Sequence, residues 1–531
     1  MRRIRFASII FALTCGTPAL ADALPDRLPD ALSVTAPAGA VHGMAIDGVR
    51  SFRGIPFAQP PVGALRWREP QPLAPWTGVR EATQWSPRCK QTSAFADMRF
   101  RSSGDSEDCL YLNIWTPAGA KPGDRLPVLF YVYGGGFVAG AADESRYDGA
   151  AMAKKGIVVV VANYRVGSFG FFAHPELTAE SPHHASGNQG LLDQVAALQW
   201  TRANIAAFGG NPQHITINGE SAGSFSMSVL TVSPLSRDLI VGVIAESGAA
   251  VEGCMGPVPL QAAEARGTEL GQTLGATSLA ALRALPADTI LASRPNSGSG
   301  LGLSIDGYLL PQTLDATYAA HQAAHVPAMI GSNSQDTFGN LVLGSETPTL
   351  AHYREGVTKL FGANAETVLK LYPAASDAQV LAASTELSSD HFLGQPTWKW
   401  FDLHRQSGEP TYYFRYNHIR PPANGLPAPA MPVIGAVHSA EIEYALGNLD
   451  VAGVSPLYTW TQADRQMSTL LQGYFVNFIK SGNPNGPGLP AWKPAGTTSP
   501  LWRQEVELPT KAKPFTDEAR YRAMDRIAAQ P

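Results

Sequence analysis

Three absences narrow the class of this protein before any motif is considered. After residue 21 the sequence has no uninterrupted apolar run near the roughly 18 residues that a membrane-spanning helix needs. It has no cluster of basic residues, and its formal net charge is −4, so we expect no nucleic-acid partner. It has neither an internal repeat nor a low-complexity tract. With 44% hydrophobic and 16% charged residues, the composition is that of a folded globular protein and not of a disordered chain.

The N-terminal 21 residues form a unit of their own. Arg2, Arg3 and Arg5 make a basic start, residues 6–13 are apolar, and Ala19-Leu20-Ala21 is a small-x-small cleavage site. This pattern predicts a secretory signal peptide that is cleaved near Ala21. We therefore expect an exported protein, periplasmic or secreted, with no integral membrane segment in the mature chain.

Cysteine is scarce, with 4 in 531 residues. Loss of the leader removes Cys15 and leaves Cys89, Cys109 and Cys254. In an oxidising compartment the nearby pair Cys89 and Cys109 is the expected disulfide, with Cys254 free.

The pattern of apolar runs predicts an α/β fold. Residues 126–132 and 157–162 are almost continuously apolar and β-branched, as in strands buried on both faces of a sheet. Residues 187–208 have helical periodicity, and further strands are expected at 215–218, 241–245 and 326–330. Alternating strands and helices favour a mostly parallel central sheet with helices on both faces. Residues 260–325 and 348–410 are predicted to be largely helical insertions that form a cap or second lobe.

The most informative motif is GESAG at residues 219–223. A short strand precedes it and a helical stretch, 222–230, follows it. Strand, glycine, serine, glycine and helix are the parts of a nucleophile elbow, which presents a serine hydroxyl at the top of a sheet. Side chains at Gly219 and Gly223 would collide with neighbouring backbone in so tight a turn. Ser221 is therefore the candidate nucleophile.

A serine acyl-transfer enzyme also needs donors for the oxyanion, a base and an acid. The run YGGGF at 133–137 follows a predicted strand, and its glycines leave backbone N–H groups free to face a substrate carbonyl oxygen. Gly135, Gly136 and the amide of Ala222 form the predicted oxyanion hole. Among the 12 histidines, those after Ser221 fit the chain order serine, acid, histidine. His438 is preferred because it lies in a loop just before a helical turn.

The chain resembles the type-B carboxylesterases, which include bacterial para-nitrobenzyl esterases and animal cholinesterases. The resemblance covers about residues 35–500 and rests on ordered elements. They are FRGIPFA at 52–58, EDCLYLN at 107–113, YGGGF, NYR at 163–165, GNQGL at 187–191, FGGNP at 208–212 and GESAG. It implies one α/β-hydrolase domain over residues 22–531 and ester hydrolysis through a covalent acyl-serine, with no metal and no cofactor. By the same resemblance Ser221 is the nucleophile, His438 the base, and Cys89 and Cys109 the first disulfide loop.

The acid departs from the family pattern, which has glutamate in a G-x-x-x-D-E-G element. The matching stretch here is GSNSQDT at 331–337, which places Asp336 at the glutamate position. Aspartate can accept the imidazole Nδ1 hydrogen, although it is one methylene shorter. Glu346 is the outside candidate, and a structural loop aspartate is the remaining interpretation of Asp336.

Two further glutamates and one histidine pair are not expected to take part in the chemistry directly. Glu220 resembles the family's buried glutamate beside the nucleophile, and Glu441 is expected to be a structural partner. Adjacent His183 and His184 cannot both face one metal ion easily, and no third ligand lies near them.

The resemblance places the 89–109 loop over the active site, where cholinesterases carry a tryptophan for the choline cation. This loop has no tryptophan, so choline esters are not expected. Candidate substrate-binding residues are Phe95, Arg99, Phe100 and Arg101. One hypothesis is that an arginine favours esters with an anionic acyl part; the alternative is that both arginines are solvated.

The leading prediction is therefore a carboxylic-ester hydrolase whose partner is a small-molecule ester. An amidase or carbamate hydrolase on the same triad is the alternative enzyme. A lipase and a non-catalytic adhesion protein of this fold are the other two hypotheses. The adhesion proteins lack a working nucleophile, and no long apolar lid is visible here.

Overall fold

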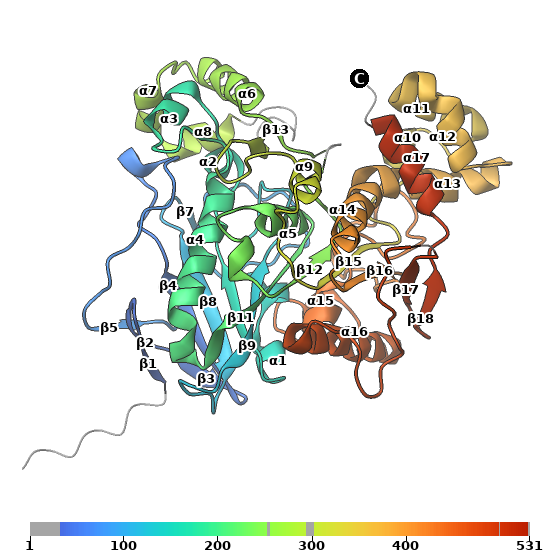
Figure 1. Ribbon diagram of the computed structural model, residues 1–531. Coiled ribbons are helices and arrows are strands. Elements are labelled where there is room, and N and C mark those ends of the chain that lie inside the picture. Colours follow the sequence, from blue (N-terminus) through green and yellow to red (C-terminus); the bar gives the residue numbers. More distant parts are fainter. Residues whose placement is uncertain (1–31, 252–254, 294–301, 499, 529–531) are drawn as a thin grey trace, which may run out of the picture.

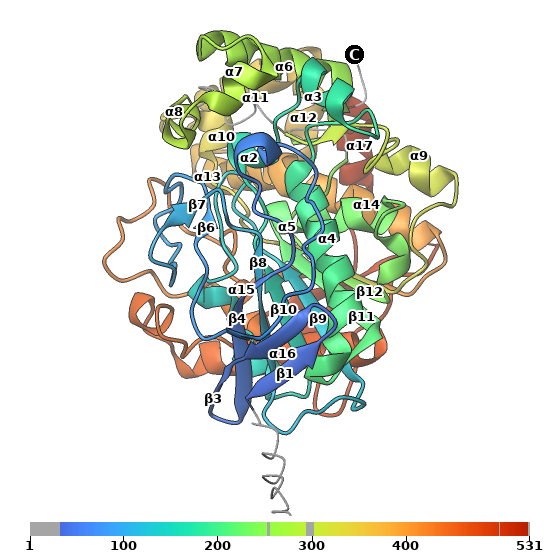
Figure 2. The same cartoon turned by 90° about the vertical axis from the view of Figure 1, so that its left-hand side faces the viewer.

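The computed structural model describes residues 32–251, 255–293, 302–498 and 500–528. Two predictions lie outside these residues, namely the signal peptide at 1–21 and the free thiol of Cys254. The chain is built around an 11-stranded sheet flanked by helices (Figures 1 and 2).

The centre of the sheet is parallel, as the apolar runs predict. In spatial order it contains β17 (Trp502–Val506), β16 (Thr411–Tyr416), β15 (Ala328–Asn333), β12 (Gly242–Glu246), β11 (Gly210–Glu220), β9 (Leu126–Val132) and β10 (Val158–Ala162). Each of these strands runs parallel to its neighbour. All residues of β10, β12 and β15 are buried, and apart from Glu246 and Asn333 at their C-terminal ends these strands consist of apolar or small residues.

Antiparallel strands complete both edges of the sheet. On one side β10 pairs with β8 (Tyr111–Pro117), followed by β4 (Val49–Pro56) and β3 (Met44–Ile46). On the other side β17 pairs with β18 (Lys511–Pro514). A separate three-stranded sheet holds β1 (Ser33–Ala36), β2 (Gly39–His42) and β5 (Val79–Glu81).

The parallel strands end together, and this positions the site. In the register of the sheet Gly219 of β11 lies opposite Val132 of β9, and Glu220 lies opposite Glu246 of β12. Glu246 in turn lies opposite Gly331 of β15. The segments that follow β9, β11, β12 and β15 therefore leave the same edge of the sheet. Ligand sites of open α/β sheets form at this edge.

Helices pack on the sheet and extend beyond it. The strands are contacted by α4 (Gln189–Asn204), α5 (Ala222–Val232), α14 (Gln395–Gln406) and the long helix α16 (Gln462–Ser481). A first outer group contains α6 (Leu260–Thr273), α7 (Leu279–Ala284) and α8 (Ala287–Ala292), with α9 (Leu314–Ala319) following. A second contains α10 (Asn340–Leu343), α11 (Leu350–Phe361), α12 (Ala365–Leu371), α13 (Asp377–Ser389) and the C-terminal α17 (Glu518–Ala528). Figure 1 shows these two groups at separate corners above the strands.

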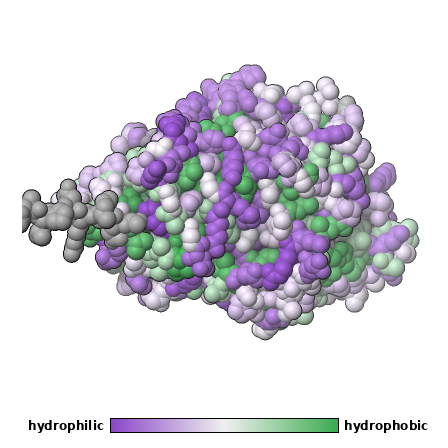
Figure 3. Space-filling model, turned by 90° about the horizontal axis from the view of Figure 1, so that it is seen from below, coloured by the Kyte–Doolittle hydropathy of each residue, from purple (hydrophilic) through white to green (hydrophobic). Residues whose placement is uncertain are grey.

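Each outer group has a small hydrophobic core of its own. Trp67, Phe172 and Leu282 belong to the core beside α6–α8, and Tyr353, Val368 and Leu387 to the core beside α10–α13. The main core lies between the sheet and its helices. Seen from below, the molecule presents hydrophilic and hydrophobic residues intermixed (Figure 3).

The remaining helices of the described chain are short segments between strands, such as α1 (Ala150–Ala153), α2 (Gly167–Gly170), α3 (Pro175–Glu180) and α15 (Ile442–Leu446). Within the described residues, no helix combines the length and apolarity that crossing a membrane requires.

Candidate active site

The nucleophile elbow forms at the end of β11. Ser221 has φ 56° and ψ −123°, a strained backbone conformation for a residue with a side chain. A Cβ on Gly219 would lie 2.6 Å from the backbone of Gly223, and one on Gly223 would lie 2.1 Å from the carbonyl oxygen of Val132. Only glycine fits at either position. The two glycines thus permit the turn that lifts Ser221 out of the sheet.

His438 is within hydrogen-bond distance of this serine. Its Nε2 atom lies 2.9 Å from the Ser221 hydroxyl, although the two residues are 217 positions apart. The imidazole side chain is 29% exposed, so a substrate can reach it. A nucleophile in contact with a base is the first requirement for nucleophilic catalysis.

Asp336 lies on the other side of the imidazole. Its Oδ1 atom is 2.9 Å from Nδ1 of His438. Its Oδ2 atom accepts hydrogen bonds from the hydroxyl of Ser247 (2.9 Å) and the backbone amide of Asn333 (3.0 Å). The residue is 2% exposed. Serine, histidine and aspartate therefore form a continuous hydrogen-bonded row with the geometry of a hydrolase triad.

The glycine turn after β9 lies beside the nucleophile. A Cβ on Gly134 would come within 2.9 Å of Cβ of Ser221. Gly135 and Gly136 have φ of 106° and 62°, and a Cβ on Gly135 would meet the carbonyl oxygen of Ala139 at 2.2 Å. Ala222 begins α5, so its amide is among the unpaired N–H groups at that helix N-terminus. Gly134, which directly precedes the two expected oxyanion-hole glycines, thus lies beside Ser221, and Ala222 follows Ser221 in the chain.

Glu220 adds a second carboxylate next to the imidazole. Its Oε1 atom is 3.3 Å from Nε2 of His438 and accepts a 2.6 Å hydrogen bond from the Ser439 hydroxyl. Burial disfavours the imidazolium, but the negative charges of Glu220 and Asp336 outweigh burial and raise the pKa of His438 to about 9. Burial also raises the pKa of Glu220, an effect that His438 and the Ser439 hydrogen bond oppose.

A layer of buried polar groups lies beneath the triad. Burial, followed by repulsion from Glu220 and Asp336, raises the pKa of Glu441 to about 8. The side-chain amide of Asn333 donates to Glu441 and to the carbonyl oxygen of Val437. Glu441 thus contacts Asn333 at the end of β15, and Asn333 in turn binds the loop that carries His438. Reasoning from the sequence assigned no role to Ser247, which lies in no motif, or to Asn333, which lies in the GSNSQDT stretch but was not singled out there.

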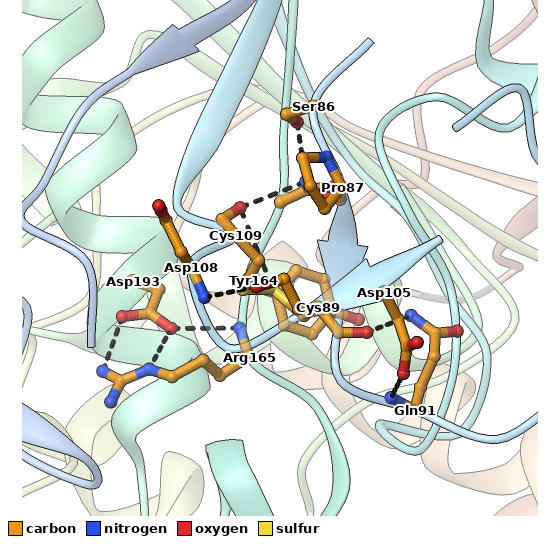
Figure 4. The surroundings of a disulfide bond; sticks show 12 residues. Ser86, Pro87, Cys89, Gln91, Asp105, Asp108, Cys109, Tyr164, Arg165 and Asp193 are labelled. Atoms are coloured by element: carbon orange, nitrogen blue, oxygen red, sulfur yellow. Dashed lines mark hydrogen bonds and ion pairs between the residues drawn. A yellow bond between two sulfur atoms is a disulfide. The ribbon is translucent and has the colours of Figure 1, made fainter. Parts of the chain in front are cut away.

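The disulfide is present between Cys89 and Cys109, which are 20 residues apart. Figure 4 shows its surroundings. The side chain of Asn163 donates to the carbonyl oxygens of Cys109 and Pro87. Nearby, the guanidinium of Arg165 forms a buried two-point ion pair with Asp193, at 2.7 and 2.8 Å. Asn163 of the NYR motif thus holds the disulfide loop to the segment after β10, and Arg165 holds that segment to α4.

The candidate substrate-binding residues of the disulfide loop differ in how far other side chains already occupy them. Arg101 is bound to Asp148 (2.6 Å), donates to the carbonyl oxygen of Asp143 and stacks over Trp85. The ring of Phe100 is covered by the guanidinium of Arg88.

Arg99 and Phe95 have fewer side-chain contacts than Arg101 and Phe100. Nη1 of Arg99 donates only to the carbonyl oxygens of Ala96 and Met98, and no described carboxylate lies within ion-pair distance of Arg99. Phe95 is 43% exposed. The terminal methyl of Met98 would lie 3.0 Å from a Cβ on Gly135, so this part of the loop borders the glycine turn.

The other candidates lie elsewhere. Glu346 is exposed and faces His352 at 3.8 Å. His183 stacks on Tyr308 and lies 3.6 Å from Glu69. Among the described residues, no group of three His, Cys, Asp or Glu is arranged to hold a metal ion. A cavity of about 250 Å³ lies among Trp67, Leu177, Gln189 and Asp306, and no triad residue lines it. Geometry around Ser221, and not cavity size, identifies the candidate site.

Comparison with known proteins gives consistent matches along the chain. The sequence profile of the carboxylesterase family matches residues 30–523. Fumonisin B1 esterase of Sphingopyxis macrogoltabida is 37% identical over 471 residues, which is 84% of this chain and 81% of that protein. Liver carboxylesterase of Sus scrofa is 34% identical over 507 residues, which is 86% of this chain and 84% of the pig protein.

A solved structure agrees with these sequence matches. The crystal structure of a carboxylesterase from Geobacillus stearothermophilus superposes with a TM-score of 0.80 at 28% identity. The superposition covers 94% of this chain and 100% of the bacterial enzyme.

Proposed function

Because this chain belongs to the carboxylesterase family and is a carboxylesterase with the α/β-hydrolase fold, we propose that it hydrolyses esters through Ser221, His438 and Asp336. The observation that carries the proposal is the hydrogen-bonded row of these three side chains. Nε2 of His438 lies 2.9 Å from the Ser221 hydroxyl, and Nδ1 lies 2.9 Å from Asp336.

The first half of the reaction forms an acyl-serine. His438 takes the hydroxyl proton of Ser221 as its oxygen bonds to the ester carbonyl carbon. The carbonyl oxygen becomes an oxyanion, which the amides of Gly135, Gly136 and Ala222 stabilise. When the carbon–alkoxy bond breaks, the imidazolium gives its proton to the leaving alcohol. In the second half, His438 takes a proton from water as the water oxygen bonds to the acyl carbon. The bond between that carbon and the Ser221 oxygen then breaks, the imidazolium returns the proton to Ser221, and the carboxylic acid leaves.

Asp336 serves as the orienting acid despite its shorter side chain. The carboxylate reaches Nδ1 at 2.9 Å because it is presented by the loop directly after β15. Hydrogen bonds from Ser247 and Asn333 hold its other oxygen, so both oxygens of the carboxylate have partners. The bound carboxylate selects the tautomer in which Nε2 is free to accept a proton.

The part of the disulfide loop that borders the glycine turn supports a preference for esters with an anionic acyl group. Arg101 is already paired with Asp148, so the proposal applies to Arg99, which has no carboxylate partner among the described residues. Arg99 follows Met98, which borders the glycine turn. A carboxylate on the acyl chain could bind this guanidinium. Fumonisin B1, the compound in the name of one relative, is therefore a reasonable natural substrate to assay.

Hydrolysis of 4-nitrophenyl acetate and butyrate tests the proposed nucleophile. We expect turnover by the wild type and its loss in Ser221→Ala. Ser226→Ala, in the helix α5 that follows Ser221, is the matched control, because the Ser226 hydroxyl donates to the carbonyl oxygen of Ala222 within that helix. A fluorophosphonate should label the wild type once and leave Ser221→Ala unlabelled. Turnover that survives Ser221→Ala would contradict the proposal.

The role of Arg99 is tested with two esters of equal acyl length. The 4-nitrophenyl monoester of glutaric acid carries a carboxylate that 4-nitrophenyl valerate lacks. Arg99→Ala should lower kcat/KM for the charged ester about tenfold and leave the neutral ester unchanged, as expected for loss of a partly exposed charged hydrogen bond. Arg101→Ala is the control and should lower stability without changing the ratio. An unchanged ratio in Arg99→Ala would end the hypothesis.

A further inference from the structure

A π-helix interrupts the long helical segment that passes the triad. Between α13 and α14 the backbone of residues Asp390–Gly394 forms a π-helical turn. π-Helices are rare, and they occur frequently at functional sites because the extra residue shifts the direction in which side chains point. One added residue rotates the following side chains by about 100° relative to a continuous α-helix.

Buried contacts hold the π-helix from the side of the outer helices. Asp390 accepts hydrogen bonds from the hydroxyls of Tyr372 (3.0 Å) and Tyr521 (2.7 Å). Its carboxylate is also 3.2 Å from the guanidinium of Arg520. A Cβ on Gly394 would lie 2.8 Å from Oδ1 of Asp390, so the turn closes tightly around this carboxylate. These buried contacts stabilise the π-helix within the fold.

Two further hydrogen-bonded contacts hold the same segment against the triad. The hydroxyl of Ser389 contacts the backbone of Thr337 at 3.2 Å (amide) and 3.1 Å (carbonyl). The hydroxyl of Thr397 accepts from the amide of Gly248 at 2.8 Å. Thr337 follows Asp336, and Gly248 follows Ser247, which itself binds Asp336. The π-helix is therefore positioned relative to the acid of the triad from both of its ends.

The side chain that this arrangement brings to the site is Phe392. Its ring centroid lies 6.5 Å from that of His438, with the two rings at 68°. Phe392 is only partly buried, so some of its ring is open to a bound molecule. His438 is the group that protonates the leaving alcohol, so a ring packed against the imidazole borders the alcohol part of the ester.

We propose that Phe392, presented by the π-helix, is a specificity residue that selects esters with an aromatic or long aliphatic alcohol. The inference rests on the proposed triad, because it takes His438 as the proton donor to the alcohol. An aromatic ring offers a flat apolar surface to such a leaving group and no hydrogen bond to a small, hydrated alcohol such as methanol.

The loop that leads to His438 supports an apolar alcohol side. Val433 and Ile434 are adjacent large aliphatic side chains that are 40% and 44% exposed, so this loop presents apolar surface to solvent. The side-chain oxygen of Gln335 accepts from the amides of Ile434 (2.7 Å) and Gly435 (2.8 Å) and so binds this loop next to Asp336. An apolar alcohol group that extends past Phe392 would find further apolar surface on this loop.

The test uses two ester series with Phe392→Ala. In the first, the acyl group stays acetate and the alcohol changes from methyl to butyl to 2-phenylethyl. In the second, the alcohol stays methyl and the acyl chain is lengthened. We expect the advantage of 2-phenylethyl over methyl acetate in kcat/KM to fall about tenfold, with the acyl series unchanged in slope. Phe392→Leu should keep much of the preference for butyl and lose that for 2-phenylethyl.

Phe361→Ala is the matched control. Phe361 is a partly buried ring that contacts His391, the neighbour of Phe392, but it is not in contact with His438. Its truncation should leave both series unchanged. An equal loss on every ester in Phe392→Ala, or a loss confined to the acyl series, would overturn the inference while leaving the esterase intact. Activity that survives in Ser221→Ala would instead overturn the proposed function. Stoichiometric fluorophosphonate labelling confirms that the variants at Phe392 and Phe361 are folded.

Discussion

Ser247 donates a 2.9 Å hydrogen bond to Oδ2 of Asp336, the carboxylate oxygen that does not face His438. The two residues lie 89 positions apart and meet because β12 and β15 are parallel neighbours that end at the same edge of the sheet. Ser247 is fully buried, so this bond is not exchanged with water. It therefore controls the direction in which the carboxylate presents its other oxygen to the imidazole.

Ser247→Ala should weaken catalysis without removing it. Loss of one buried hydrogen bond, worth about 1 kcal/mol, allows the carboxylate to rotate and predicts a five- to tenfold decrease in kcat. KM should change little, because Ser247 contacts no substrate. Steady-state kinetics measure the effect. Ser236→Ala is the control, since its buried hydroxyl donates only to the carbonyl oxygen of Leu230. Equal kcat in Ser247→Ala and wild type would show that Asp336 is held without this bond.

Replacing Asp336 by asparagine should have the larger effect. An amide at this position can present an N–H to Nδ1, which favours the tautomer that cannot accept the Ser221 proton. A decrease in kcat of about 10⁴-fold is expected by analogy with the general behaviour of such triads. Glu346→Asn is the control at the alternative acid and should be fully active. The decrease is large enough to be measured as turnover of a chromogenic acetate ester. A near-normal kcat in Asp336→Asn would mean that another acid orients His438.

The pH dependence of kcat/KM should respond to Glu220. Neutral imidazole is the active form of the base, so the rate rises as pH increases through the pKa of His438, about 9. Glu220 stabilises the imidazolium, and Glu220→Gln removes this negative charge. The acid limb of the profile should therefore move to lower pH, by about one unit for loss of one close charge. A limb that stays in place, or that moves to higher pH, would contradict the assigned electrostatics. Glu346→Gln, far from the imidazole, is the control.

The disulfide should contribute measurably to stability. Closure of a loop whose cysteines are separated by 20 in the sequence is expected to stabilise the fold by about 3 kcal/mol. Replacing both Cys89 and Cys109 by serine should lower the free energy of unfolding by about this amount in urea titrations. Activity should fall as well, because the loop places Met98 against the glycine turn at Gly135. Unchanged unfolding in the double variant would show that the polar contacts of the loop suffice.

Local features of the sequence were enough to predict the elbow, the glycine turn and the main strands. β9 spans the predicted residues 126–132, and α5 begins at the predicted Ala222. These predictions succeed because backbone constraints are local: a strand–serine–helix turn admits only glycine at 219 and 223. Two helical features were not anticipated, the 20-residue helix α16 and the π-helix. The interruption at 390–394 depends on Tyr372, Tyr521 and Arg520, which no local pattern connects.

The sequence by itself determined which residues could do the chemistry, and the tertiary structure decided which of them meet. Gly135, Ser221 and His438 follow from motif and resemblance. Contacts between distant segments decided the rest. Asp336, 102 positions before His438, reaches Nδ1 of its imidazole. Arg101 is paired with Asp148, whereas Arg99 donates to backbone carbonyl oxygens and has no carboxylate partner among the described residues. The register of parallel strands brings the ends of β9, β11, β12 and β15 together, and hydrogen bonds from Ser247 and Asn333 then orient the acid. Such contacts arise only from three-dimensional packing, because a local motif can mark a residue as a candidate but does not show which distant residue it meets.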